Sequence, residues 1–246
     1  MVGEQIINAI KIHHPNSDLY VGINPSSLAN EWINIIRNSG INNKIIITPQ
    51  HLVTNSDASA YQAALNLLKQ SKKSYDLIWF FQTKSAYQQK SYNIFVDFLD
   101  NFISKPKEAR EVFLKNKNIG SYSLYTVIHP KELNDVWSSY LKMQFKWLPI
   151  MHLYTLFVLR GKPVHYFLNN CNKNFFEEPL LAVGGTNRYY FERDFYQIIY
   201  MLGYLPATKN VIQLHFNNWD AVVSNRENFD KIVNNRNKLL YNIKMI

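Results

Sequence analysis

The feature that most constrains the fold is an alternation of strand and helix patterns over residues 18–103. Short apolar runs bounded by turn signals predict strands, and apolar residues at helical spacing predict helices. The predicted segments are strand 18–24, helix 28–38, strand 44–48, helix 57–70, strand 75–81 and helix 91–103. This order is typical of an α/β protein with a mostly parallel central sheet flanked by helices.

Local signals support several of these segments. The run 75–81 reads Tyr-Asp-Leu-Ile-Trp-Phe-Phe, and its unbroken apolar residues predict burial on both faces of a parallel sheet. Ser26 or Ser27 is expected to cap the helix that follows the first strand. Gly40 is expected to end that helix.

The second half of the chain is less regular. We expect a strand at 118–128, helices at 132–146 and 151–160, a strand at 180–186, and helices at 191–202 and 219–246. Gly161 is expected to stop the helix at 151–160. Since no repeat or linker interrupts the chain, we predict a single domain with halves at about 1–105 and 106–246.

Composition excludes several classes of protein. The 246 residues are 47% hydrophobic and 15% aromatic, which provides more apolar surface than a disordered chain has. No apolar run reaches the roughly 20 residues of a membrane-spanning helix, and no secretory signal is recognisable. The single Cys171 excludes an internal disulfide and a cysteine zinc site. We therefore expect a cytoplasmic protein.

The net charge leaves the partner open. Lys and Arg number 27 against 18 Asp and Glu, which gives a net charge of +9. A basic protein suits nucleic acid, but it suits a nucleotide-sugar diphosphate or an anionic membrane surface equally well. An AT-rich coding sequence, which favours Asn, Ile and Lys, gives the same balance.

Several well-known motifs are missing. The sequence has no G-x-G-x-x-G after the first strand and no P-loop, which disfavours NAD-type dehydrogenases and P-loop kinases. It also lacks H-E-x-x-H and G-x-S-x-G, which disfavours hydrolases. We interpret His13 and His14 as a surface pair rather than as metal ligands.

Polar residues follow each of the first three predicted strands. Ligands bind at the carboxyl ends of parallel strands, so these residues are candidates for a binding site. They are Asn24 after the first strand, Thr48 and Gln50 after the second, and Gln82, Thr83, Lys84 and Ser85 after the third. Lys84 stands where a phosphate lies in this fold class, with hydroxyl donors beside it. The alternative is that Lys84 only solubilises the end of the strand.

Three further clusters have two interpretations each. Asp57 is either a helix cap or a carboxylate that binds a ribose or base. Gly185 and Thr186 lead into an aromatic segment that forms either a sugar-stacking platform or part of the core. Glu177 and Glu178 supply a general base or are solvated loop acids.

The order of these clusters resembles a known family. The matching stretches are Asp18-Leu-Tyr20, Asn55-Ser56-Asp57, Tyr75-Asp76, Gln82-Thr83-Lys84-Ser85, and Gly185-Thr186 with Phe191 and Arg193. Over residues 18–205 they resemble the GT-A-like glycosyltransferases of the rhamnan synthesis protein F type. The resemblance implies a single GT-A-like domain, with a nucleotide-binding half before about residue 105 and an acceptor-side half after it.

The resemblance also implies an activity. Such an enzyme transfers a sugar from a UDP-, GDP- or dTDP-sugar to a glycan, polysaccharide or lipid-linked acceptor. Asp57 would lie near the nucleoside and Lys84 near the diphosphate. Gly185, Thr186 and Arg193 would border the donor sugar or the acceptor pocket. The base would be Glu177, Glu178 or Asp194.

The chain departs from the family pattern at three points. The glycine and arginine of the family's Asn-Gly-Arg-Asp version are missing around Asn55 and Asp57. Gln82 stands where the family usually has His, and the Asp-x-Asp that holds a divalent metal is absent. Lys84 can supply positive charge in place of a metal, so metal dependence stays open. A degenerate glycosyltransferase scaffold and a non-catalytic basic binding module remain as alternatives. The expected location is the cytoplasm, with peripheral association at the inner face of an acidic membrane.

Overall fold

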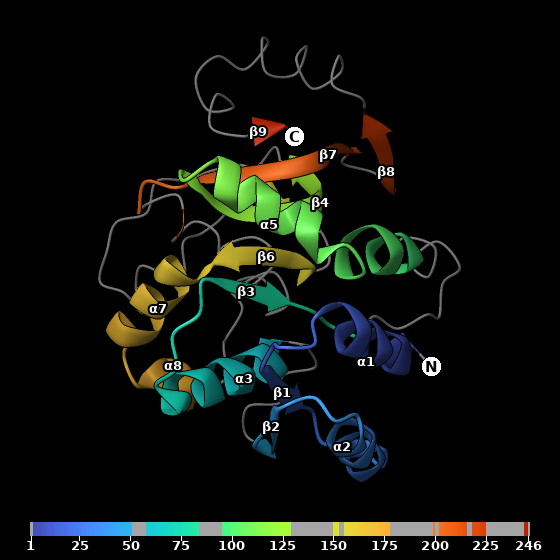
Figure 1. Ribbon diagram of the computed structural model, residues 1–246, viewed down its shortest axis with the longest axis vertical. Coiled ribbons are helices and arrows are strands. Elements are labelled where there is room, and N and C mark those ends of the chain that lie inside the picture. The colour runs from blue at the N-terminus through green and yellow to red at the C-terminus, as the bar shows by residue number, and fades with distance from the viewer. Residues whose placement is uncertain are drawn as a thin grey trace. The chain divides into compact units, whose positions relative to one another are not determined.

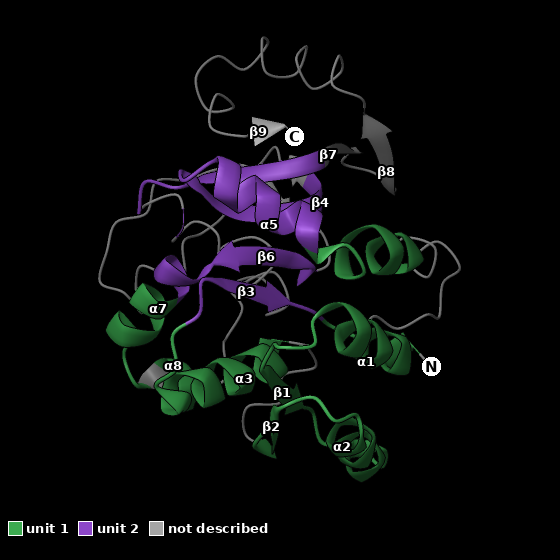
Figure 2. Cartoon of the chain, in the orientation of Figure 1, with its two compact units in different colours: residues 1–74, 82–106, 165–190 green, residues 75–81, 107–164, 191–246 purple. Residues whose placement is uncertain are grey.

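The computed structural model describes residues 2–50, 58–83, 95–128, 150–152, 155–177, 199, 202–215, 218–224 and 244–245. The chain divides into two compact units, each assembled from three separate stretches (Figure 2). Unit 1 comprises residues 1–74, 82–106 and 165–190, and unit 2 comprises 75–81, 107–164 and 191–246. The predicted mixture of α and β structure is confirmed. The single domain, with its two halves, stays a prediction.

Unit 1 contains a two-stranded parallel sheet of β1 (Leu19–Ile23) and β2 (Asn43–Ile47). Leu19 lies opposite Asn43, and the register continues without a break to Ile23 opposite Ile47. The described helices in this unit include α1 (Val2–His13), α2 (Ala29–Asn38), α3 (Ala58–Ser71), α8 (Asn174–Glu177) and the π-helical turn η2 (Leu99–Ile103). Residues 165–170 of α7 (Gly161–Asn170) also belong to it. Figure 1 shows α3 alongside β1 and β2. The strands and helices predicted between residues 18 and 70 are therefore confirmed where the structure describes them.

The start of α2 differs from its prediction. Leu28 is the N-cap residue, and no side chain caps the helix there. The carbonyl of Ser26 instead accepts a hydrogen bond from the Ala29 N–H at 3.2 Å. The prediction of a serine side-chain cap is wrong, because the backbone turn before the helix already satisfies this donor. Gly40 follows the helix with a φ of 79°, as a terminating glycine should.

The two neighbouring histidines at the end of α1 differ in burial. His13 is exposed, but His14 is 3% exposed and its Nε2 lies 2.8 Å from the Ile103 carbonyl oxygen. A carbonyl only accepts, so Nε2 carries the proton in this bond. The prediction that both histidines lie on the surface is therefore wrong for His14. Its hydrogen bond connects the end of α1 to η2.

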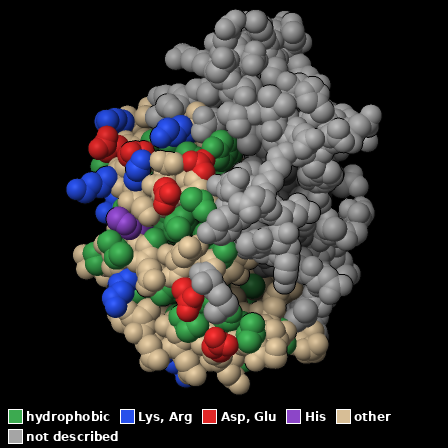
Figure 3. All heavy atoms as spheres, turned by 90° about the vertical axis from the view of Figure 1, so that its right-hand side faces the viewer, with side chains coloured by type: hydrophobic (Ala, Val, Ile, Leu, Met, Phe, Trp, Pro, Cys, Tyr) green, Lys and Arg blue, Asp and Glu red, His purple; other side chains and the backbone are tan. Residues whose placement is uncertain are grey.

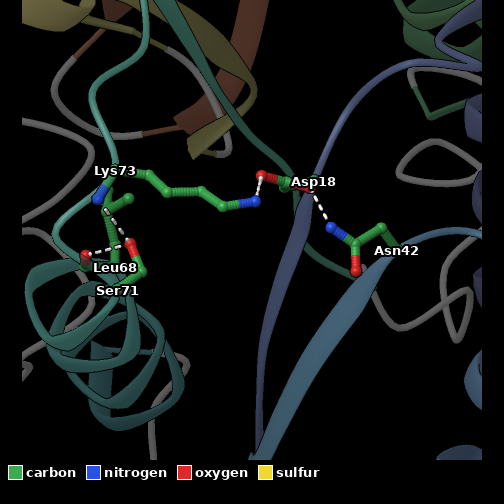
Figure 4. A network of polar contacts seen from close by, with 5 residues as sticks. All are labelled: Asp18, Asn42, Leu68, Ser71 and Lys73. Carbon is green, nitrogen blue, oxygen red and sulfur yellow. Dashed lines mark hydrogen bonds and ion pairs between the residues drawn. The ribbon is translucent and has the colours of Figure 1, made fainter.

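A polar network ties together the amino ends of β1 and β2 and the carboxyl end of α3 (Figure 4). The Asp18 carboxylate accepts hydrogen bonds from Asn42 Nδ2 and from Lys73 Nζ, the latter at 2.6 Å. The hydrogen bond and charge of Asp18 raise the pKa of Lys73. Ser71 accepts from the Lys73 N–H and donates to the Leu68 carbonyl. This network lies at the opposite end of β1 from the predicted ligand site.

Unit 2 is built on a mixed sheet with the strand order β3-β6-β4-β7-β8. The strands are β3 (Leu77–Phe80), β4 (Ile119–Ile128), β5 (Ile150–His152), β6 (Phe157–Arg160), β7 (Leu205–His215), β8 (Asn218–Ser224) and β9 (Lys244–Met245). The pairs β4–β7 and β7–β9 are parallel, and the other described pairs are antiparallel. The strand predicted at 75–81 exists, but it pairs antiparallel with β6. A mostly parallel central sheet is therefore not confirmed.

Two predicted helices in the second half are strands where the structure describes them. Residues 151–160 contribute to β5 and β6, which are separated by a turn with Thr155 at a φ of 54°. Periodicity does not separate a buried strand from a buried helix in so short an apolar run. Within the tail expected to be helical at 219–246, the described segments belong to β8 and β9. The expected elements at 132–146 and 180–186 lie outside the described residues.

Gly161 begins a helix rather than ending one. It is the first residue of α7 (Gly161–Asn170), and its N–H donates to the Asp76 carbonyl at 2.7 Å. A side chain at this position would overlap the Tyr75 carbonyl, which explains why glycine is required. The strand β3 therefore begins in close contact with the start of α7.

Helix α5 (Pro106–Lys115) covers the sheet of unit 2 (Figure 1). Arg160 of β6 donates to the carbonyls of Phe113 at 3.1 Å and Asn116 at 3.3 Å, near the end of α5. Its Nε also donates to the Ile119 carbonyl at 2.8 Å. The Phe157, Val158 and Leu159 side chains are completely buried in this core. In the part of the chain that the structure describes, no helix is long and apolar enough to cross a membrane.

Candidate functional site

The carboxyl ends of β1 and β2 meet at one edge of the unit 1 sheet. The Thr48 N–H donates to the Ile23 carbonyl at 2.8 Å, so the pairing continues one residue beyond β2. Asn24 follows β1 directly. We call Asn24, Thr48, Gln82 and Thr83 the strand-end site, since all four were predicted to border a ligand and all four are described.

Asn24 and Thr48 lie on the α3 side of the sheet. Gly22 packs so closely on α3 that a side chain there would overlap the Ala60 carbonyl. Side chains alternate along a strand, so Asn24 shares the side of Gly22. Gly22 is opposite Ile46 in the register, and Thr48 is two residues beyond Ile46. Both side chains therefore point toward the amino-terminal half of α3.

Thr48 is the most informative residue of this site. Its side chain is 1% exposed, and its Oγ1 has no hydrogen-bond partner among the described residues. Leaving a buried hydroxyl without a partner costs about 1–3 kcal/mol. Since β2 leads into α3, the amino end of that helix faces the same edge and contributes positive potential. This end of the sheet thus combines a buried hydroxyl that has no described partner with the positive end of a helix dipole.

Thr83 lies near the beginning of α1. A side chain on Gly3 of α1 would overlap the Trp32 ring and would come within 3.1 Å of Thr83 Cγ2. Trp32 lies in the first turn of α2, which follows the carboxyl end of β1. Thr83, which follows the third predicted strand, therefore lies near the start of α1 and near the Trp32 ring of α2.

Of the remaining predicted site residues, the structure describes Glu177. Glu177 is exposed at the end of α8, which is attached to α3 by a hydrogen bond from Gln62 Nε2 to the Phe175 carbonyl. The others lie outside the described residues: Asp57, Lys84, Ser85, Glu178, Gly185, Thr186, Arg193 and Asp194. Their roles stay predictions.

Unit 2 contains a cluster of buried polar side chains that was not predicted from the sequence. His152 Nδ1 lies 2.9 Å from Thr126 Oγ1, and its Nε2 lies 2.9 Å from Ser121 Oγ. All three side chains are completely buried, and burial lowers the pKa of His152 to about 3. The imidazole is therefore neutral, with one nitrogen donating and the other accepting. We assign this His152 cluster a structural role, because it is closed to solvent on every side.

Among the described residues, no group of three or more His, Cys, Asp or Glu side chains is arranged to hold a metal ion. Burial raises the pKa of the Cys171 thiol to about 12, so it is protonated at neutral pH and unreactive.

Comparison of the chain with family models, curated protein sequences and solved structures gives no match.

Proposed function

We propose that this protein is a glycosyltransferase that transfers a sugar from a nucleotide-diphosphate donor to a glycan or polysaccharide acceptor. The proposal includes a single GT-A-like domain with a mostly parallel central sheet. The observation that carries it is the buried Thr48 hydroxyl, which has no described partner and stands beside Asn24 at the carboxyl ends of two parallel strands. Thr83, which lies near Gly3 and the Trp32 ring of α2, is compatible with it.

The strand-end site has donors and acceptors suited to a nucleotide. A hydroxyl and an amide, as in Thr48 and Asn24, bind base edges and ribose hydroxyls by directional hydrogen bonds. In the proposal, Asp57 adds a carboxylate for the nucleoside. Gln82, Thr83, Lys84 and Ser85 bind the diphosphate, with Lys84 as the charged group.

The proposed reaction is a displacement at the anomeric carbon. An acceptor hydroxyl forms the new glycosidic bond, and the bond to the diphosphate breaks with its electron pair leaving on the nucleoside diphosphate. Lys84 stabilises the negative charge that develops on this leaving group. Glu177, Glu178 or Asp194 takes the proton of the acceptor hydroxyl. Gly185, Thr186 and Arg193 border the donor sugar or the acceptor.

The proposal extends to partners and location. The substrates are a UDP-, GDP- or dTDP-sugar and a glycan or lipid-linked acceptor. A lipid-linked acceptor places the enzyme in the cytoplasm at the inner face of an acidic membrane. Lys84 supplies only one positive charge. The experiment below therefore also tests whether a divalent metal is required.

The experiment combines binding with turnover. Calorimetry with UDP, GDP and dTDP, with and without Mn²⁺, is followed by donor consumption with a panel of nucleotide sugars. We expect one nucleotide to bind and one donor to turn over. Lys84→Ala should abolish turnover without unfolding the protein, whereas Lys72→Ala, at an exposed lysine that follows α3, should leave it unchanged.

Two outcomes contradict the proposal. If no nucleotide binds and no donor turns over, the chain is not a glycosyltransferase. If turnover is absent and a nucleic acid binds with a steep salt dependence, the basic binding module is correct.

On the face shown in Figure 3, the Lys and Arg side chains of the described residues lie among Asp and Glu side chains. The described residues form no continuous basic field suited to a phosphate backbone on that face.

A further inference from the structure

The outward face of α5 in unit 2 carries the most exposed large apolar side chain among the described residues. Ala109, Val112 and Phe113 of this helix are buried, with 1–6% exposure. Leu114 is 77% exposed. At 100° per residue, Leu114 lies within about 20° of Lys107 and about 40° of Arg110, on the side of the helix opposite the buried face. An apolar side chain therefore stands in the middle of a solvent-facing stripe.

The charges around Leu114 are not balanced. Glu108 pairs with Lys209 at 3.8 Å, and Glu111 pairs with Lys115 at 2.9 Å. These two acids are already matched by cations. Lys107, Arg110 and Lys117 are exposed, and no ion pair joins any of them to another described residue. The stripe consequently has an excess of positive charge around one exposed leucine.

We propose that this face docks on an anionic lipid surface. We call it the α5 face, made of Lys107, Arg110 and Leu114 of the helix together with Lys117, which follows two residues after the end of α5. Lysine and arginine are attracted to anionic headgroups, and leucine gains by entering the boundary with the acyl chains. A phosphate backbone would use the cations but would leave Leu114 in water. The combination of cations around an exposed leucine thus favours a bilayer over a nucleic acid.

The strength of the interaction follows from the size of the face. Each Lys or Arg near an acidic surface strengthens binding roughly fivefold. With three such cations and one leucine, the contact is weak and reversible, and it is lost at high salt. The inference assigns the membrane association of the proposed function to the α5 face. It does not depend on whether the protein transfers a sugar.

The test is sedimentation of the full-length chain with vesicles, in the absence of any nucleotide. Phosphatidylcholine vesicles with about 30% phosphatidylserine are compared with pure phosphatidylcholine at low and high salt. We expect binding only to the anionic vesicles. The double variant Lys107→Glu, Arg110→Glu should weaken binding by at least about 25-fold, and Leu114→Ser by about tenfold.

A matched double variant provides the control. Lys44→Glu with Lys173→Glu makes the same change in net charge at two exposed lysines of unit 1, and it should bind nearly as tightly as the wild type. Equal loss in both double variants would overturn the inference, because attraction would then depend on net charge alone. Binding to single-stranded nucleic acid but not to vesicles, unaffected by Leu114→Ser, would also overturn it. Because no donor sugar is present, the result is independent of whether the protein is a glycosyltransferase.

Discussion

At the scale of single residues, two buried threonines differ in what their hydroxyls contact. Thr126 lies in β4 and is hydrogen-bonded to His152 at 2.9 Å. Thr48 is buried to nearly the same degree, but its Oγ1 has no described partner. The hydroxyl of the same residue type therefore has a protein partner in one place and no described partner in the other.

Replacing each threonine by valine separates these roles. Thr48→Val should leave the free energy of unfolding unchanged or raise it by up to about 1 kcal/mol, because an unsatisfied hydroxyl is removed. It should weaken nucleotide binding about fivefold to tenfold, as loss of one hydrogen bond does. Thr126→Val should lower the free energy of unfolding by about 1–3 kcal/mol and leave nucleotide affinity unchanged. Urea denaturation and calorimetry measure both quantities. Equal destabilisation by the two changes would contradict the assignment of Thr48.

The buried imidazole of His152 makes stability depend on pH. Burial lowers the pKa of this group from its ordinary 6.5 to about 3. Below pH 6.5 the unfolded chain binds a proton at this residue, whereas the folded chain does not until about pH 3. The free energy of unfolding should therefore fall by about 1.4 kcal/mol per pH unit as the pH decreases through this window.

Urea denaturation between pH 7 and pH 4.5 measures this slope. The control is His152→Gln, which keeps one donor and one acceptor but does not titrate. The difference between the two slopes isolates the histidine from the carboxylates, which are common to both proteins. If His152→Gln shows the same slope as the wild type, His152 is not the responsible group.

At the scale of elements, local signals predicted unit 1 better than unit 2. The strands β1 and β2 and the helices α2 and α3 begin and end within a residue or two of their predicted bounds. Turn residues such as Gly40 mark these boundaries in the sequence itself. The segment at 151–160 has no such internal marker, and its strand conformation depends on pairing with β3 and β4.

The contact between β1 and α3 is tested by adding a single methyl group. Gly22→Ala places a side chain against the Ala60 carbonyl, so α3 must move. We expect a loss of about 1–3 kcal/mol in the free energy of unfolding, together with weaker nucleotide binding. Gly40→Asn is the control: no atom lies within 4 Å of a side chain there, and asparagine tolerates the positive φ of 79°. Thermal denaturation should show a clear decrease only for Gly22→Ala, and similar melting temperatures for the two variants would exclude close packing at Gly22.

At the scale of the whole molecule, both units are assembled from distant stretches of chain. Unit 1 takes in residues 165–190 as well as its two amino-terminal stretches. These residues supply Phe167 and Phe175, whose completely buried rings meet edge to face at 5.0 Å. The core of unit 1 thus depends on residues from the second half of the sequence.

A truncated chain tests this dependence. The fragment 1–106 contains β1, β2 and α3, but it lacks the buried Phe167 and Phe175. We expect it to show no cooperative unfolding and no dispersed NMR spectrum, whereas the full-length chain should show both. A folded fragment that binds nucleotide would mean that the first half is an independent domain.

The sequence alone determined the order of strands and helices along residues 19–71, the mixed α/β class, and the polar residues that follow the first two strands. These features depend on turn residues and on local periodicity, which act between neighbours in the chain. The tertiary structure decided the antiparallel partner of β3, the strands at 150–160, the burial of Thr48 and the exposure of Leu114. Each of these depends on groups far apart in the sequence, because strand pairing and burial are set by which surfaces meet after the chain has folded.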